Sequence, residues 1–124
     1  MEGILFEIKV TDEAKEFINS IHKNAKDKLL YNIRRIQKGE KNNEIFKKLD
    51  KSEIWEFRTL YNHIAYRLFA FWDTEEDKLI IATHGIIKKT QKTPRKEIRK
   101  AELIRKTYFE SKHNKNGNNE IEFI

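Results

Sequence analysis

Three strand-like segments in the middle of the chain constrain its fold more than any other feature. Residues 54–60, 64–71 and 79–87 each match the length and pattern of a β-strand. The linkers between them, "YNH" and "WDTEED", are short enough for hairpins. We therefore predict an antiparallel three-stranded meander at the centre of the fold.

The residues before this meander predict one strand and two helices. Residues 4–10, "ILFEIKV", alternate between apolar and polar after a short apolar start, which indicates a first strand. Thr11 can then cap a helix, whose buried face consists of Ala14, Phe17, Ile18 and Ile21. A second helix is expected from about residue 25 to residue 38, with Gly39 as its stop.

A third helix is expected after the meander. Thr93 offers a capping hydroxyl, and Pro94 suits the first helical position. The apolar stripe of this helix is narrow and consists of Ile98, Ala101, Ile104 and Tyr108. The order β-α-α-β-β-β-α predicts an α+β fold, in which the helices pack on one face of a small, mainly antiparallel sheet and leave the other face open.

Length and composition narrow the possible classes of protein. We expect one domain, residues 1–111, followed by a flexible polar tail, residues 112–124, whose apolar residues Ile121, Phe123 and Ile124 can dock on the domain. The chain has no cysteine, and its four histidines show no paired ligand spacing, so neither a metal nor another cofactor is expected. The sequence has no membrane-length apolar run and no signal-peptide pattern, which predicts a cytoplasmic protein.

Positive charge is concentrated in one segment. Residues 84–106 contain six lysines and three arginines against two glutamates, a balance of +7, although the whole chain carries only +6. Such a cluster favours a polyanionic partner, with nucleic acid as the first candidate and an anionic membrane surface as the second. The basic face of the third helix can equally be ordinary solvated surface.

A second group of basic residues is expected on the open face of the sheet. Glu56 and Arg58 share one face of their strand by alternation, and Arg67 interrupts the apolar run "IAYRLFAFW". Lys88 and Lys89 follow at the rim of the sheet. These cations can converge on one concave surface, but Arg67 can also simply pair with a nearby carboxylate such as Glu56.

Three motifs together resemble a known family. "IWEFR", "IAYRLFAFW" and "LIIATHGIIKKTQKTPRKEIRKAELIRKTYFE" are similar to successive signatures of the HigB-type, phage-derived branch of the RelE/ParE toxin superfamily. The resemblance spans about residues 54–110, and "KKTQKTP" with the following basic helix is its most specific part. Phe57 and Ile86 stand where that family has leucine and phenylalanine, which affects packing more than chemistry.

The resemblance implies a RelE-like fold and a function. The protein would be the toxin of a type II toxin–antitoxin system, a ribosome-dependent mRNA endoribonuclease that needs no metal. Its partners would be mRNA on the ribosome, ribosomal RNA and a helix-turn-helix, HigA-like antitoxin, and no membrane. The related ParE branch inhibits DNA gyrase on the same fold, so a non-enzymatic gyrase inhibitor or nucleic-acid-binding module is the alternative. A phage structural or accessory protein is a third possibility.

The implied reaction assigns roles to particular residues. Cleavage by 2′-hydroxyl attack needs a base, stabilisation of the phosphorane charge and an acid for the leaving 5′-oxygen. Arg58 and Arg67 suit the charge stabilisation, and Lys88 and Lys89 suit a proton carrier and a phosphate clamp. The remaining candidates for proton transfer are His84 and Glu97, although His84 can also be a core histidine. The residues assigned to RNA binding are Lys92, Arg95, Lys96 and Arg99.

Overall fold

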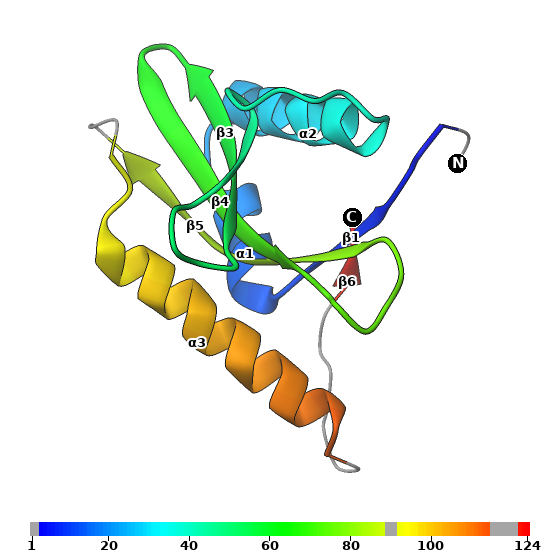
Figure 1. Ribbon diagram of the computed structural model, residues 1–124. Coiled ribbons are helices and arrows are strands. Elements are labelled where there is room, and N and C mark those ends of the chain that lie inside the picture. Colours follow the sequence, from blue (N-terminus) through cyan, green and yellow to red (C-terminus); the bar gives the residue numbers. More distant parts are fainter. Residues whose placement is uncertain (1–2, 89–91, 115–121) are drawn as a thin grey trace.

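A computed structural model of the protein describes residues 3–88, 92–114 and 122–124 (Figure 1). It contains every predicted element and adds two short strands, β2 and β6. In chain order the elements are β1 (Glu7–Val10), α1 (Asp12–Ser20), α2 (Lys23–Gln37), β2 (Phe46–Lys48), β3 (Trp55–Tyr61), β4 (Ile64–Trp72), β5 (Leu79–Lys88), α3 (Arg95–Lys112) and β6 (Glu122–Phe123). The α+β class is therefore confirmed.

The six strands form one mixed sheet in the order β2-β3-β4-β5-β1-β6. The pairs β3–β4 and β4–β5 are antiparallel, which confirms the predicted meander. In contrast, β1 pairs parallel with β5, so α1 and α2 belong to the long connection that takes the chain from one side of the meander to the other. This sheet places the ends of β3, β4 and β5 side by side.

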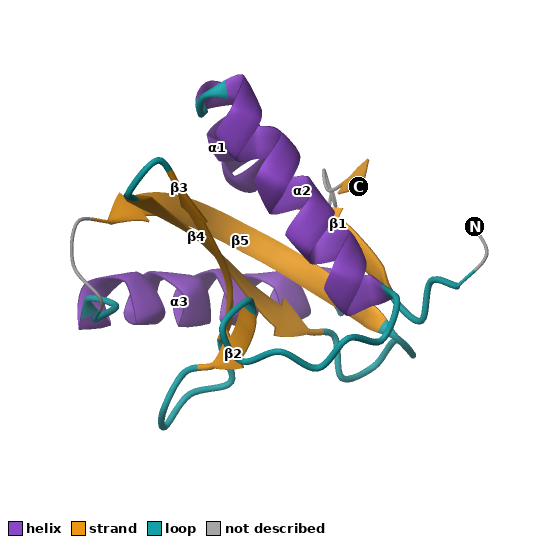
Figure 2. Cartoon of the chain, turned by 90° about the horizontal axis from the view of Figure 1, so that it is seen from above, coloured by secondary structure: helices purple, strands orange, loops and turns teal. Residues whose placement is uncertain are grey.

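The prediction that all helices pack on one face was wrong. Helices α1 and α2 cover one face of the sheet, and α3 lies across the opposite face (Figures 1 and 2). The reason lies in β4, which is apolar on both faces: Leu68 contributes to the core under α1 and α2, whereas Phe69 and Phe71 contribute to the core under α3. An apolar surface on both sides of a sheet requires a cover on both sides.

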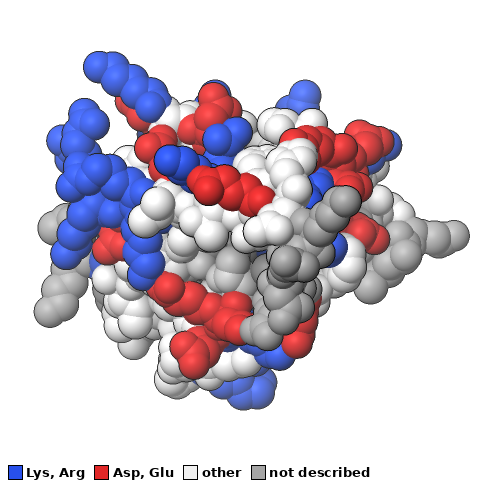
Figure 3. Space-filling model, turned by 90° about the horizontal axis from the view of Figure 1, so that it is seen from below, with Lys and Arg blue, Asp and Glu red and all other residues white. Residues whose placement is uncertain are grey.

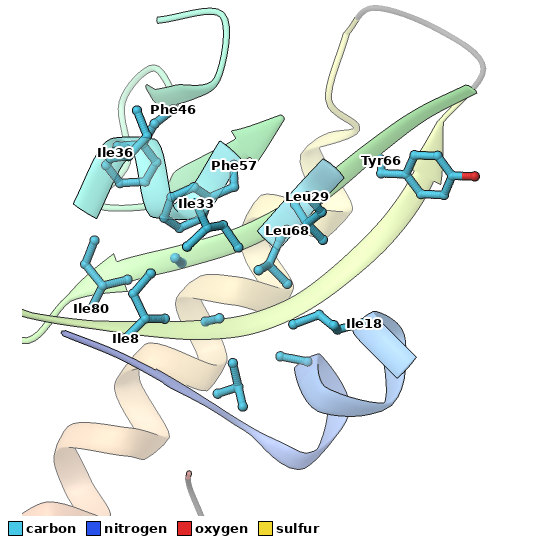
Figure 4. Close-up of a cluster of buried hydrophobic side chains, with 14 of the residues drawn as sticks. Ile8, Ile18, Leu29, Ile33, Ile36, Phe46, Phe57, Tyr66, Leu68 and Ile80 are labelled. Atoms are coloured by element: carbon cyan, nitrogen blue, oxygen red, sulfur yellow. The ribbon is translucent and has the colours of Figure 1, made fainter. Parts of the chain in front are cut away.

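The larger core lies between the sheet and the first two helices (Figure 4). The β2 segment enters this core through Phe46, whose ring stacks on Phe57 with ring centroids 4.3 Å apart. Leu49 instead packs on the α3 side. The sequence analysis predicted no strand in this segment.

Two of the three predicted helix signals work as expected. The Thr11 side chain accepts a hydrogen bond of 3.1 Å from the Ala14 amide at the start of α1. Gly39 follows α2 with a φ of 103°, a conformation that favours glycine. The third signal fails because Thr93 does not cap α3: Pro94 stands at the N-cap with no side-chain hydrogen bond. The Thr93 hydroxyl instead donates its hydrogen bond to Glu56 of β3.

A β-bulge at Thr83 changes the face to which the end of β5 belongs. Ala82 pairs with Ala70, but the next paired residue of β5 is His84, opposite Phe69. Thr83 is the extra residue, and its carbonyl accepts a hydrogen bond of 2.7 Å from the Thr11 hydroxyl. Alternation restarts at the bulge, so the even-numbered residues beyond it lie on the α3 side of the sheet, whereas Ala82 lies on the α1 side.

Helix α1 approaches β5 very closely at Gly85. A Cβ atom at this position would lie 2.2 Å from the Cδ2 atom of Phe17, which is far below van der Waals contact. The hydrogen atom of glycine is thus what allows the Phe17 ring to pack against the strand.

The C-terminal end of α3 is fastened to the β4–β5 hairpin. Asp73 is buried and accepts hydrogen bonds from the Tyr108 hydroxyl (2.6 Å) and the Lys112 ammonium (2.8 Å). Burial opposes the charged form of Asp73, but these donors outweigh it and lower its pKa. The helix runs one residue past the predicted domain boundary at residue 111.

The described end of the tail lies on the sheet. Strand β6 pairs antiparallel with β1, and the Ile124 amide donates a hydrogen bond of 2.8 Å to the Ile8 carbonyl. Residues 115–121, including Ile121, lie outside the described residues. Within the described ranges, no helix combines the length and the apolar character needed to cross a membrane.

Candidate functional site

The centre of the candidate site is a carboxylate between two arginines. Arg58 on β3 lies directly opposite Arg67 on β4, so both side chains leave the same face of the sheet. The Oε1 atom of Glu56 lies 3.1 Å from Nε of Arg67 and 3.3 Å from Nε of Arg58. The alternative in which Arg67 pairs with Glu56 is therefore confirmed, and the predicted meeting of the two arginines is present as well.

The two guanidinium groups are enclosed at their inner ends. The side chain of Arg67 is 6% exposed and that of Arg58 is 22% exposed, beside a Glu56 side chain that is 3% exposed. Both Nε atoms are buried and lack a hydrogen bond of good geometry. The terminal Nη nitrogens are not among the buried atoms that lack a hydrogen bond. Arg58, as the more exposed of the two side chains, is the better placed to meet an anion from solvent.

Lys88 and Thr93 complete this group. Thr93 lies between β5 and α3, and its hydroxyl donates a hydrogen bond of 2.5 Å to Oε2 of Glu56. The ammonium of Lys88, at the end of β5, lies 3.4 Å from the Thr93 hydroxyl. Burial lowers the pKa of Lys88, and the neighbouring Arg67 lowers it further. We call Glu56, Arg58, Arg67, Lys88 and Thr93 the Glu56 cluster; with Lys88 protonated, three cations and one carboxylate give it a net charge of +2.

Sequence reasoning found three of these five residues as site candidates. It considered Glu56 only as a counter-ion and Thr93 only as a helix cap. The available signal for Glu56 was its position two residues before Arg58, which puts both on one face of β3. No signal in the sequence indicated that Thr93 would turn away from the helix.

His84 and Glu97 form a separate pair. His84 Nε2 lies 3.1 Å from Oε1 of Glu97, and His84 Nδ1 lies 3.0 Å from the Thr83 hydroxyl. His84 is 1% exposed and packs against the Phe69 ring. Burial lowers its pKa, although the hydrogen bond to Glu97 opposes this shift. Within the described residues neither side chain bonds to the Glu56 cluster, and the pair links β5 to the first turn of α3.

The basic residues at the start of α3 are on the surface. Lys92, Arg95, Lys96 and Arg99 are all exposed. None of the four forms an ion pair with another described residue, whereas Lys100 pairs with Glu13 of α1. Figure 3 shows lysine and arginine side chains gathered at the end of the molecule where α3 begins. Lys89, the remaining predicted site residue, lies outside the described residues.

This arrangement suits the binding of a phosphate. Guanidinium groups offer paired donors to phosphate oxygens and remain charged, and the nearby ammonium adds a third cation. Among the described residues, no group of three or more histidine, cysteine or acidic side chains is placed to hold a metal ion. The fold and the cluster thus define a small α+β domain with a cationic site on one face of its sheet.

Comparison with known proteins gives the family. Residues 16–106, which are 91 of the 124 residues, match the family described as "Phage derived protein Gp49-like (DUF891)". The chain belongs to this family, a toxin-like family of toxin–antitoxin systems that is related to the RelE and HigB toxins. The matched range includes the whole Glu56 cluster. No curated protein matches the chain.

Proposed function

We propose that this protein is a HigB-type toxin of a type II toxin–antitoxin system and cleaves mRNA on the ribosome. The observation that carries the proposal is the pairing of Arg58 and Arg67 across β3 and β4, with the Lys88 ammonium beside them, in a member of a toxin family. Three cations around one point match the charge that develops on a phosphorane.

The proposed reaction uses the outer ends of the arginines. Their Nη groups contact the non-bridging oxygens of the scissile phosphate, while the buried Nε atoms remain beside Glu56. The cluster lies on a stiff sheet, so the donors are positioned before the substrate arrives. The ribosome supplies the orientation of the message, which compensates for a site built with few proton-transfer groups.

The exposed basic residues at the start of α3 are assigned to binding ribosomal RNA. These residues, Lys92, Arg95, Lys96 and Arg99, have no acidic partner among the described residues, so their charge is available to a polyanion. The proposed site of action is the cytoplasm, and the proposed inhibitor is a helix-turn-helix, HigA-like antitoxin.

The test is expression of the protein with and without the adjacent gene, followed by mapping of mRNA ends on translating ribosomes. We expect growth arrest that the adjacent gene relieves, together with new 3′ ends inside codons. Growth arrest without new mRNA ends would reject the nuclease. A chain that causes neither arrest nor cleavage would favour the phage structural or accessory protein instead.

A second candidate is a non-enzymatic basic module that binds nucleic acid or inhibits gyrase. It is favoured by the contrast between the largely buried Glu56 cluster and the exposed cations at the start of α3. Charge reversal at Arg95, Lys96 and Arg99 should reduce both ribosome association and its salt dependence. The matched control reverses three exposed lysines elsewhere, Lys38, Lys41 and Lys47. If the salt dependence of ribosome association in a sedimentation assay is unchanged by the charge reversal, these α3 residues are ordinary solvated surface.

A further inference from the structure

The proposed reaction needs a base, and the Glu56 cluster contains one carboxylate, that of Glu56 itself. His84 and Glu97, two of the proton-transfer candidates expected from the sequence, are bonded to each other and not to the cluster. Among the described residues, Glu56 is the only acidic side chain within ion-pair distance of Arg58 or Arg67. The question is whether its geometry suits proton transfer or only charge balance.

The two oxygens of Glu56 have different neighbours. Oε1 faces the Nε atoms of Arg58 and Arg67, whereas Oε2 accepts a hydrogen bond from the Thr93 hydroxyl. Here, one oxygen fixes the carboxylate in place and the other holds an alcohol in the position from which a proton is taken.

We propose that Glu56 is the general base for the 2′-hydroxyl of the substrate and that Lys88 is the general acid for the leaving oxygen. This inference rests on the proposed function. In the substrate complex, the ribose 2′-hydroxyl takes the place of the Thr93 hydroxyl on Oε2 of Glu56. The Lys88 ammonium already lies 3.4 Å from that hydroxyl position, within reach of the same phosphodiester.

The step balances within the cluster. Glu56 takes the 2′-hydroxyl proton, and the 2′-oxygen forms a bond to phosphorus. The bond from phosphorus to the 5′-oxygen breaks, and Lys88 gives a proton to that oxygen. The products are a 2′,3′-cyclic phosphate and a 5′-hydroxyl end. Glu56 is left protonated and Lys88 neutral, and exchange with water restores both.

The neighbouring arginines do not prevent Glu56 from acting as a base. Both Nε atoms face Oε1, which leaves Oε2 to a hydroxyl group. A bound phosphodiester brings its own negative charge to the same guanidinium groups, so it competes with Glu56 for them.

The experiment measures single-turnover mRNA cleavage on programmed ribosomes for Glu56→Gln. Glutamine keeps an acceptor oxygen for the arginines but cannot take a proton. We expect cleavage about 10²- to 10⁴-fold slower than wild type, with ribosome binding unchanged. The matched control is Glu53→Gln, at an exposed glutamate three residues earlier, which should cleave at the wild-type rate.

Two further measurements separate a base from a structural counter-ion. Added formate should restore part of the cleavage lost in Glu56→Ala, because a small carboxylate can enter the vacated position and take the proton. On a substrate with sulfur in place of the 5′-oxygen, Lys88→Met should recover, because a thiolate leaves without an acid, whereas Glu56→Gln should stay slow. Unfolding in urea checks that each variant is folded.

These experiments distinguish failure of the Glu56 assignment from failure of the proposed function. A wild-type protein that does not cleave mRNA rejects the proposed function itself. A wild-type protein that cleaves, together with a folded Glu56→Gln that cleaves within about tenfold of it, overturns the assignment of the base. If Glu56→Gln does not fold, absence of formate rescue in a folded Glu56→Ala overturns the assignment as well.

Discussion

Removal of the Arg67 side chain tests the Glu56 cluster most directly. Arg67→Ala takes away one of the two guanidinium groups that face Glu56 and lowers the net charge of the cluster from +2 to +1. The Glu56 carboxylate does not become isolated, because Nε of Arg58 remains 3.3 Å from Oε1 and the Thr93 hydroxyl remains on Oε2. The substitution should therefore affect catalysis more than folding.

The contacts of Arg67 determine how much its removal should affect stability and how much it should affect catalysis. Leaving a buried charge without any partner costs about 3–5 kcal/mol. Since Glu56 keeps two partners, we expect the free energy of unfolding to fall by only about 1–3 kcal/mol. Loss of one preorganised donor to a developing oxyanion slows reactions by about 10²- to 10³-fold, which is about 2.7–4 kcal/mol of activation free energy. Cleavage and growth arrest should thus disappear from a protein that still folds.

The assays are urea unfolding, growth after induction and mRNA cleavage on ribosomes. Arg34→Ala is the matched control, because Arg34 is a partly buried arginine of α2 far from the cluster in the chain. A well-folded Arg67→Ala protein with normal toxicity would falsify the assignment of Arg67 to the active site. A variant that does not fold would show that the arginine is chiefly a structural partner of Glu56.

The remaining predictions concern stability. Gly85→Ala should lower the free energy of unfolding by at least about 1–3 kcal/mol through its clash with Phe17, and Phe17→Ala in the same chain should relieve part of that loss in urea unfolding. Burial lowers the pKa of His84, so the unfolded chain binds more protons as pH falls below about 6.5, and stability should fall there by up to about 1.4 kcal/mol per pH unit. His84→Gln should flatten this dependence relative to wild type, and equal slopes would contradict the argument. Tyr108→Phe removes a hydrogen bond to the buried Asp73 carboxylate and should cost about 1.5–3 kcal/mol by the same assay; a loss near zero would show that the other donors to Asp73 suffice.

The sequence predicts the local structure of this protein better than its assembly. The meander, the cap at Thr11 and the stop at Gly39 follow from short-range patterns, and each is present. The position of α3 depends on β4, which directs Leu68 to one face and Phe69 to the other. Such a continuous apolar run is typical of a strand that is covered on both faces, so the second layer of helix was predictable and was overlooked.

The sequence predicted the cations of the candidate site but not the residues that hold them together. The positive charges of Arg58, Arg67 and Lys88 stand out in the sequence because charged residues are rare within strands. Their organising carboxylate does not stand out, since a glutamate beside an arginine usually indicates simple pairing. The sheet register that brings Arg58 opposite Arg67, and the turn that brings Thr93 to Glu56, are properties of the folded chain alone.

The bulge at Thr83 makes the length of β5 as important as its composition. If β5 kept its length but paired without the bulge, simple alternation would direct Lys88, six residues after Ala82, to the side of α1 and α2. All the residues of the cluster would still be encoded, but one cation would be on the wrong side of the protein. A single-residue deletion beyond the bulge, between His84 and Lys88, should consequently abolish function, because it moves the Lys88 side chain to that side as long as the bulge is kept, whereas deletion of Thr83 itself should leave Lys88 on the α3 side.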